Sequence, residues 1–355
     1  MSSPGLSRIR SLVGIQEIGL ILVVVLLGAV LTAFGGKVRM VEFRPNAAGE
    51  NERVIVEKNK FLNARNLTQL AKDTSFIAIM AVGATFVIIA GGIDLSVGAT
   101  YALASVLSAL VFSKGEDQVL AGVLVCLGAA TLCGLLNGGM IVLLKVHPFI
   151  ITLGTMAIYR GIAFVVTQGQ SVGGFPEPFR NFVRQEFSGG LSLVPLVVMV
   201  LVAVVGGIYL SRLAAGRRIY AVGGNELASR FSGIHVDRVK LSVFVISGLT
   251  AGIAALLALG YYGSASSGDG QGYELNVIAA AVVGGASLSG GKGSALGALL
   301  GALIIQMIST GIVILNIDQN YSQIIIGAVV ILAVLFDQLN NWLAKRRLAA
   351  RAVNP

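Results

Sequence analysis

Long apolar runs separated by short polar stretches dominate the chain. Runs bounded by Gly, Pro or charged residues lie near 14–34, 70–90, 96–112, 118–143, 148–168, 193–210, 239–260, 275–289, 294–315 and 321–342. A helix that crosses the hydrocarbon core of a membrane needs about 20 mostly apolar residues, and most of the runs reach or approach that length. The pattern predicts an all-α integral membrane protein with about ten transmembrane helices over residues 14–342.

The first apolar run follows Arg8 and Arg10, as the core of a signal peptide also would. A signal-peptide core has about 7–15 apolar residues, and the run 14–34 is longer. We therefore expect a retained membrane anchor, with residues 1–13 in the cytoplasm.

The polar stretch after the first run has the pattern of a β-hairpin. Residues 38–43 and 53–57 place apolar or β-branched residues at roughly alternate positions, and the segment between them is rich in turn-forming residues. We expect a small hairpin within an extracytoplasmic loop, 35–69, and no other strands in the chain.

Composition supports a membrane protein and excludes several other classes. The charged fraction is 12%, about half the roughly 25% of a soluble domain, while 55% of residues are hydrophobic and the mean hydropathy is +0.85. A soluble enzyme, a disordered chain and a disulfide-rich secreted domain are excluded. The net charge of +9 does not indicate nucleic-acid binding, because basic residues of membrane proteins gather in cytoplasmic loops.

The distribution of basic residues predicts the orientation in the cell (inner) membrane. If both termini are cytoplasmic, the inner segments hold many more basic than acidic residues, notably the segment 211–238 and the basic tail 343–355. The later outer segments are mainly acidic, as the positive-inside rule requires. The loop 35–69 departs from this trend, since its charges are mixed and mostly basic.

Residues suited to catalysis or metal binding are scarce. Cys126 and Cys133 lie seven positions apart in one apolar run, which separates them by roughly 10 Å along a helix, too far for a disulfide. His147 precedes a proline at the start of a run, and His235 lies in a polar segment. We expect no catalytic residues, no cofactor and no metal.

The segment 211–238 is expected to form a short exposed helix. Asn225 is a suitable N-cap, Glu226 falls in the first turn, and Gly233 stops the helix. Leu227, Phe231 and Ile234 then form an apolar stripe, and Asp237 is placed to cap the next span. Such a helix fits a groove on another protein, or it rests on lipid; the residues alone leave both readings open.

Three sequence blocks resemble the permeases of monosaccharide ABC transporters of the ribose, xylose and galactose type. They are Gly-Gly-Ile-Asp-Leu-Ser-Val-Gly at 91–98, the segment 216–234, and Gly-Tyr-Glu-Leu at 272–275 followed by the glycine-rich 284–293. The blocks occur in the family's order, and the resemblance extends from about Phe61 to Trp342. The sequence departs from the family at Leu227, where a small residue is usual, and in the longer, more charged loop 37–60.

The resemblance implies the partners and the coupling residues. A pair of ATPase subunits would dock on 211–238, an extracytoplasmic sugar-binding protein would deliver the substrate, and a second copy of the permease would complete the pathway in the lipid bilayer. The coupling residues would be Glu226, Leu227, Arg230, Phe231 and Gly233. A nucleoside or branched-chain amino-acid permease of similar build is the alternative. A secondary transporter or an intramembrane enzyme would need more buried ionisable or paired catalytic groups.

The chain does not itself contain an ATP site. Leu-Ser-Gly-Gly-Lys at 288–292 imitates a signature of ABC ATPases, but no phosphate-binding loop accompanies it. ATP hydrolysis is therefore expected in a separate subunit.

Polar residues within the spans either line a sugar pathway or serve the structure, because such residues are costly in a bilayer and face the protein interior. Asp94 is expected to pair with Arg160 or to cap a broken helix after Gly91-Gly92, and Ser96 to cap the helix that follows. The candidate set is Asp94, Ser96, Asn137, Arg160, Glu274 and Asn276, with Gln306 and Gln323 as further polar positions.

Overall fold

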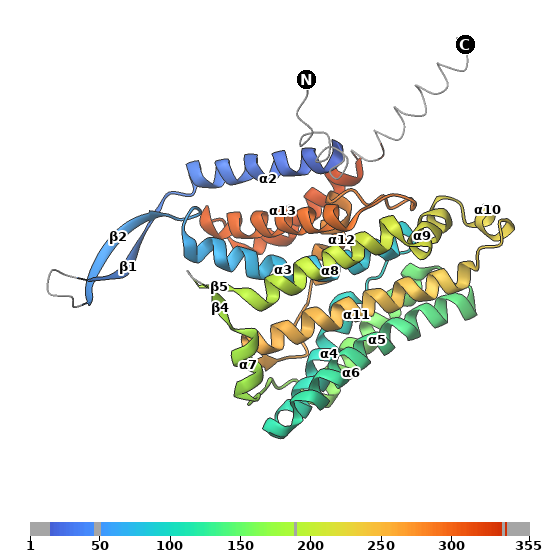
Figure 1. Cartoon of the computed structure of the whole chain (residues 1–355), viewed down its shortest axis with the longest axis horizontal. Helices are drawn as coiled ribbons and strands as arrows, with labels where there is room; N and C mark the ends of the chain where they lie inside the picture. Colours follow the sequence, from blue (N-terminus) through green and yellow to red (C-terminus); the bar gives the residue numbers. More distant parts are fainter. Residues whose placement is uncertain (1–14, 46–50, 188–189, 336–337, 339–355) are drawn as a thin grey trace, which may run out of the picture.

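The computed structural model describes residues 15–45, 51–187, 190–335 and 338, so the predicted segments 1–13 and 343–355 lie outside it. The described chain is mainly helical (Figure 1). Its longer helices are α2 (Ile15–Phe34), α3 (Ala64–Ile89), α4 (Val97–Phe112), α5 (Val119–Leu144), α6 (Pro148–Thr167), α8 (Leu193–Arg212), α11 (Val236–Tyr262), α12 (Tyr273–Val283) and α13 (Ala295–Ile314). Short helices are α7 (Glu177–Val183), α9 (Ala214–Gly224) and α10 (Glu226–Phe231).

Seven helices of the described chain are long and apolar enough to cross a membrane, which confirms the all-α membrane fold. Three shorter apolar helices accompany them, Val97–Phe112, Tyr273–Val283 and Gln319–Leu335. One predicted span is wrong, because the helix in 275–289 ends at Val283 and has only 11 residues. The helix of the span predicted near 70–90 begins earlier, at Ala64.

The helix α3 forms the centre of the bundle, and α8, α11, α12 and α13 surround it. Of its membrane-crossing window, 94% is buried within the chain, compared with 22% for α6 and α8. A helix that is apolar on all sides and covered by other helices is a core helix. The outer helices instead expose apolar side chains, as helices in contact with lipid do.

Small residues bring α5 and α11 into close contact. A Cβ atom added at Gly134 would collide with the Phe244 carbonyl, and one added at Gly248 would collide with the Ala130 carbonyl. Because such residues let two helix backbones touch, they determine where membrane helices pack.

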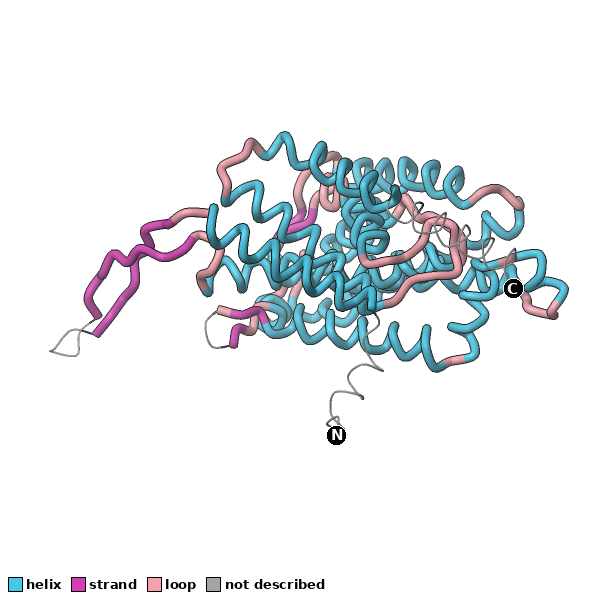
Figure 2. The backbone as a smooth tube through the Cα atoms, turned by 90° about the horizontal axis from the view of Figure 1, so that it is seen from above, coloured by secondary structure: helices cyan, strands magenta, loops and turns pink. Residues whose placement is uncertain are grey.

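The predicted hairpin is present and is longer than expected. Its strands, β1 (Lys37–Pro45) and β2 (Asn51–Asn59), pair antiparallel with Val41 opposite Ile55. The hairpin projects beyond the bundle at the end opposite to α10 (Figures 1 and 2). The expectation of no other strands is wrong, because two-residue ladders join β3 (Val172–Gly173) to β6 (Ser264–Ala265) and β4 (Glu186–Phe187) to β5 (Leu191–Ser192).

Two short helices begin inside the bundle with their N-termini together. At the start of α4, Gly98 lies so close to Gly270 and to Glu274 in the first turn of α12 that any Cβ there would collide with both. The rings of Tyr101, one turn along α4, and Tyr273, the first residue of α12, are 5.5 Å apart between centroids. Discontinuous helices of this kind place polar backbone groups within a membrane, which is tolerated only where other protein covers them.

Candidate functional site

The segment that joins α8 to α11 contains the helix predicted from the sequence. The Asn225 side chain accepts a hydrogen bond from the Ala228 N–H and so caps α10. At the other end, Gly233 has φ +81°, and the N–H groups of Gly233 and Ile234 donate to the carbonyls of Arg230 and Ser229. This pair of bonds is a Schellman motif, in which glycine is favoured. The start and the stop of the helix are both confirmed.

Charged side chains fasten α10 to the start of α11. Lys240 Nζ donates to Glu226 Oε2 at 2.7 Å, and Arg230 Nη2 donates to Asp237 Oδ1 at 2.8 Å. Arg230 also lies 3.4 Å from Glu226 Oε1. The Lys240 hydrogen bond, with a smaller contribution from Arg230, lowers the pKa of Glu226 despite its partial burial. Asp237 therefore binds Arg230, and the predicted cap of α11 by this residue is wrong.

The outer face of α10 is apolar and uncovered in the isolated chain. Leu227 is 64% exposed and Phe231 84% exposed, one turn apart on the same side. Ile234, the third residue of the predicted stripe, packs partly against the main core instead. An exposed aromatic side chain beside charged groups is typical of an interface anchor.

The second and third sequence blocks meet beside α10 at the end of α3, directly before the first block, mainly through backbone contacts. The Gly291 N–H donates to the Ile89 carbonyl at 2.9 Å, and the Tyr220 hydroxyl donates to the Gly293 carbonyl at 2.7 Å. A Cβ at Gly223 would collide with the Ile89 carbonyl and lie 2.7 Å from the Gly291 nitrogen. At Gly223 the end of α3, the end of α9 and the loop between α12 and α13 are thus in direct backbone contact, and the Tyr220 side chain adds a bond from α9 to the loop.

Asp94, Ser96 and Asn137 belong to one buried hydrogen-bond network. Asp94 Oδ1 accepts from the Ser96 N–H at 2.9 Å and from the Ser96 hydroxyl at 2.7 Å, while Oδ2 accepts from the Ser247 hydroxyl at 2.7 Å. Asn137 Nδ2 donates to Ser96 Oγ, and Asn137 Oδ1 accepts from the Tyr159 hydroxyl. The network joins the break before α4 to α5, α6 and α11, and all five side chains are buried.

This network corrects two expectations. Asp94 does not pair with Arg160, whose Nη1 donates to the carbonyls of Ser267 and Asp269 at 2.8 and 2.6 Å. Ser96 occupies the N-cap position of α4 but makes no side-chain cap bond. The Asp94 carboxylate accepts from the Ser96 N–H and so lies at the N-terminus of α4, a favourable position for an acidic group.

The other predicted polar residues lie around the junction of α4 and α12. Arg160 anchors the loop before α12, and Glu274 stands in the first turn of that helix. Glu274 Oε2 is buried and has no hydrogen-bond partner within the described chain. Asn276 is partly buried on the same helix. These residues are separate from the Asp94 network.

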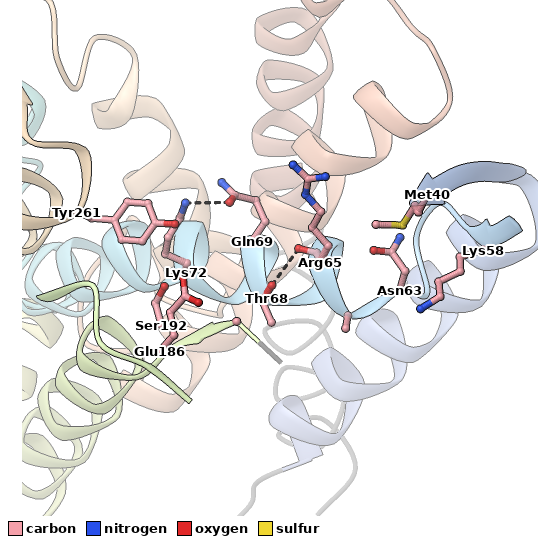
Figure 3. Close-up of a pocket in the computed structure, with 12 residues that line it drawn as sticks. Met40, Lys58, Asn63, Arg65, Thr68, Gln69, Lys72, Glu186, Ser192 and Tyr261 are labelled. Carbon is pink, nitrogen blue, oxygen red and sulfur yellow. Dashed lines mark hydrogen bonds between the residues drawn. The ribbon is translucent and has the colours of Figure 1, made fainter. Parts of the chain in front are cut away.

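A cavity of about 490 Å³ opens at the hairpin end, between the base of the hairpin, α3 and β4–β5 (Figure 3). The buried Lys72 side chain closes one side of it; Nζ lies 3.9 Å from the centroid of the Tyr261 ring and donates to Gln69 Oε1 at 2.9 Å. Asp73 Oδ1, at 3.5 Å, balances its charge. Lys72 could not be predicted from the sequence as a cavity residue, because its partner ring is nearly 190 positions away.

An apolar bundle with interrupted helices inside it, and with one capped, exposed helix at its end, has the architecture of a membrane transport subunit. The chain matches the family described as "Branched-chain amino acid transport system / permease component" over residues 66–334. The protein belongs to this family, and the hairpin lies outside the matched region.

Curated relatives cover most of the chain. It is 39% identical over 281 residues to the D-allose transport system permease protein AlsC of Escherichia coli (strain K12), covering 79% of this chain and 85% of that protein. It is 41% identical over 288 residues to the ribose import permease protein RbsC of Bacillus subtilis (strain 168), covering 80% and 88%. It is 32% identical over 300 residues to the autoinducer 2 import system permease protein LsrD of E. coli O9:H4 (strain HS), covering 81% and 90%. No solved structure matches the chain.

Proposed function

We propose that the protein is the membrane-spanning subunit of an ABC importer and passes a monosaccharide across the cell membrane. The observation that carries this proposal is the convergence of these blocks, in which Gly223, in the last turn of α9 just before α10, contacts the backbone at the end of α3 and in the loop after α12. The names of the relatives, which include allose and ribose permeases, support a sugar rather than the amino acid in the family's description.

In this proposal, ATPase subunits bind the 211–238 segment, and Phe231 and Leu227 enter a groove on the ATPase. Glu226, Arg230 and Gly233 fix the helix that presents them: two by ion pairs to α11 and one by ending the helix. Both termini and α10 are cytoplasmic, and the hairpin end faces the extracytoplasmic binding protein. A second copy of the chain completes the pathway.

Movement of α10 would change access to the pathway through the interrupted helices. A displacement of α9 and α10 carries the end of α3 and the 284–293 loop with it, since backbone atoms touch directly at Gly223. ATP binding then shifts the permease between outward-open and inward-open states only as far as the ATPase binds the two states with different affinity.

The test is uptake into proteoliposomes that contain the permease, its ATPase and sugar-loaded binding protein. Phe231→Ala should abolish ATP-driven uptake and ATPase binding, because an interface anchor contributes about 2–4 kcal/mol. Phe164→Ala is the matched control, since Phe164 is also exposed, at 58%, but lies on α6. Uptake of leucine or a nucleoside but not of a sugar would favour the alternative permeases, and uptake without ATP would contradict the ABC mechanism.

A further inference from the structure

A second cavity, of about 410 Å³, lies between α3, α13 and the helix Gln319–Leu335 at the hairpin end of the bundle. Its volume is within the range of about 300–1,000 Å³ that small-molecule sites occupy. Gln306 lies eight residues from the end of α13 and Asp73 nine residues from the start of α3. The cavity therefore extends roughly 12–14 Å from the ends of these helices into the bundle.

Polar side chains face one another across this cavity. On α3 they are Asn66, Gln69 and Asp73, and on α13 they are Gln306, Ser309 and Thr310, in each case at helical spacing on one face. Two facing polar stripes on apolar helices are costly in a membrane and mark a site that contacts water or a polar ligand.

Several of these groups lack a partner within the described chain. Ser309 donates to the Ile305 carbonyl of its own helix. Gln306 and Thr310, by contrast, make no side-chain hydrogen bond there, and neither do Gln319 and Ser322 on the third wall. Amides and hydroxyls of this kind both donate and accept, which is what the hydroxyl groups of a sugar require.

The charge of the cavity selects among ligands. Among the described residues that line it, Asp73 alone carries a charge, and Lys72 Nζ compensates that charge from 3.5 Å. Asp73 also accepts from Gln69 Nε2 at 2.9 Å. The carboxylate of an amino acid would meet no cationic side chain among the described lining residues, whereas a neutral polyol meets amide and hydroxyl groups together with the apolar side chains of Ile312 and Val313.

We propose that this cavity is a monosaccharide-binding site on the extracytoplasmic part of the pathway, with Gln306 and Thr310 as its hydrogen-bonding residues. The assignment rests on the proposed sugar-permease function. The unpaired groups bind the hydroxyls of a sugar released from the binding protein. Because each hydrogen bond contributes only modestly to the net binding free energy, the sugar binds weakly and dissociates readily toward the rest of the pathway.

The first test measures sugar transported per ATP hydrolysed in the reconstituted complex, with ribose and allose as probes. Gln306→Leu and Thr310→Val should each lower this ratio by about 3- to 10-fold, the effect of losing one net hydrogen bond at a polar site. Thr32→Val is the matched control, because the Thr32 hydroxyl on α2 bonds to the Gly28 carbonyl of its own helix. An unchanged ratio of sugar transported per ATP hydrolysed in both cavity variants, or an equal loss in Thr32→Val, would overturn the proposed binding site.

A second measurement does not depend on transport by the apolar variants. Thr310→Cys, in a chain in which the buried Cys126 and Cys133 are replaced by alanine, should react with an external water-soluble maleimide. High ribose should slow this reaction, and glycine betaine at the same osmolality should not. If ribose has no effect while the unsubstituted complex transports ribose, the cavity proposal is wrong and the permease function stands. If the unsubstituted complex transports neither sugar, the proposed function itself fails.

Discussion

The contact between Gly223 and the end of α3 predicts opposite outcomes for two neighbouring glycines. Both Gly223 and Gly224 lie in the last turn of α9 without a left-handed φ. An alanine Cβ at 223 would collide with the Ile89 carbonyl, whereas one at 224 meets no atom within 4 Å. The two substitutions Gly223→Ala and Gly224→Ala therefore change the intrinsic helix preference by nearly the same amount. They differ in the space available to the added methyl group.

The expected magnitude follows from three effects. Glycine-to-alanine substitution favours a helix by up to about 1 kcal/mol, and this gain is common to both variants. Overpacking at 223 costs about 1–3 kcal/mol. Displacement of Gly291 weakens its 2.9 Å bond to the Ile89 carbonyl, a further loss of about 1 kcal/mol. Gly223→Ala should thus be about 2–4 kcal/mol less stable than Gly224→Ala.

Unfolding of the purified variants in mixed detergent and SDS measures this difference directly, and reconstituted uptake measures its consequence. Gly223→Ala should also lower the sugar transported per ATP hydrolysed while it still binds the ATPase, because the exposed face of α10 is unchanged. Equal stability and equal uptake in the two variants would refute the idea that this backbone contact transmits movement from α10.

Three further predictions concern other parts of the chain. Asp94→Ala removes the acceptor of three hydrogen bonds and should destabilise the protein by about 2–5 kcal/mol in SDS unfolding. Asp94→Asn should recover part of this loss of stability. A stable Asp94→Asn variant without transport would instead indicate a pathway role. Gln170 and Ser232 are both exposed, so single cysteines at these positions can test the orientation in the membrane. In a chain without other cysteines, Gln170→Cys should react with a membrane-impermeant thiol reagent added outside, and Ser232→Cys with the same reagent added inside. Reaction of both variants from outside would contradict a cytoplasmic location of α10. Because the pKa of Glu226 is lowered in the folded protein, its bond to Lys240 stabilises α10 fully above the ordinary carboxyl pKa, near 4.3. This stabilisation is lost as the pH falls through the lower pKa of the folded state. Acid should therefore increase hydrogen exchange in α10, and Glu226→Gln should abolish that pH dependence.

The sequence predicted those elements whose signals are local. The helix α10 has a capping residue, a helical stripe and a terminal glycine within about ten positions, and the hairpin has two alternating strands around a turn. Helices of nearly continuous apolar composition were also located to within a few residues. These features depend on neighbours in the chain, and therefore a single sequence contains most of the information.

Features that depend on distant partners were not predictable in this way. The Asp94 carboxylate binds Ser247, 153 positions away, and nothing near either residue indicates the pairing. The helix α12 ends before the apolar run does, because Gly285 takes φ +95° where the loop packs on α9. An apolar run shows that a segment enters the membrane but does not show where its helix is interrupted.

The two ends of the bundle use different chemistry, and this difference is consistent with a division of labour in transport. At the α10 end, glycines allow backbones to touch, so a movement is transmitted without a side chain that can change rotamer and absorb it. At the hairpin end, amide and hydroxyl groups line a cavity whose one charged lining residue within the described chain, Asp73, is paired with Lys72, and weak hydrogen bonds there suit a ligand that must leave. The buried Asp94 network lies between them and joins α4, α5, α6 and α11, with its oxygen atoms already bonded. In the proposed mechanism, the solute therefore binds at the hairpin end, and the Asp94 network holds together the helices α4, α5, α6 and α11 while α10 moves.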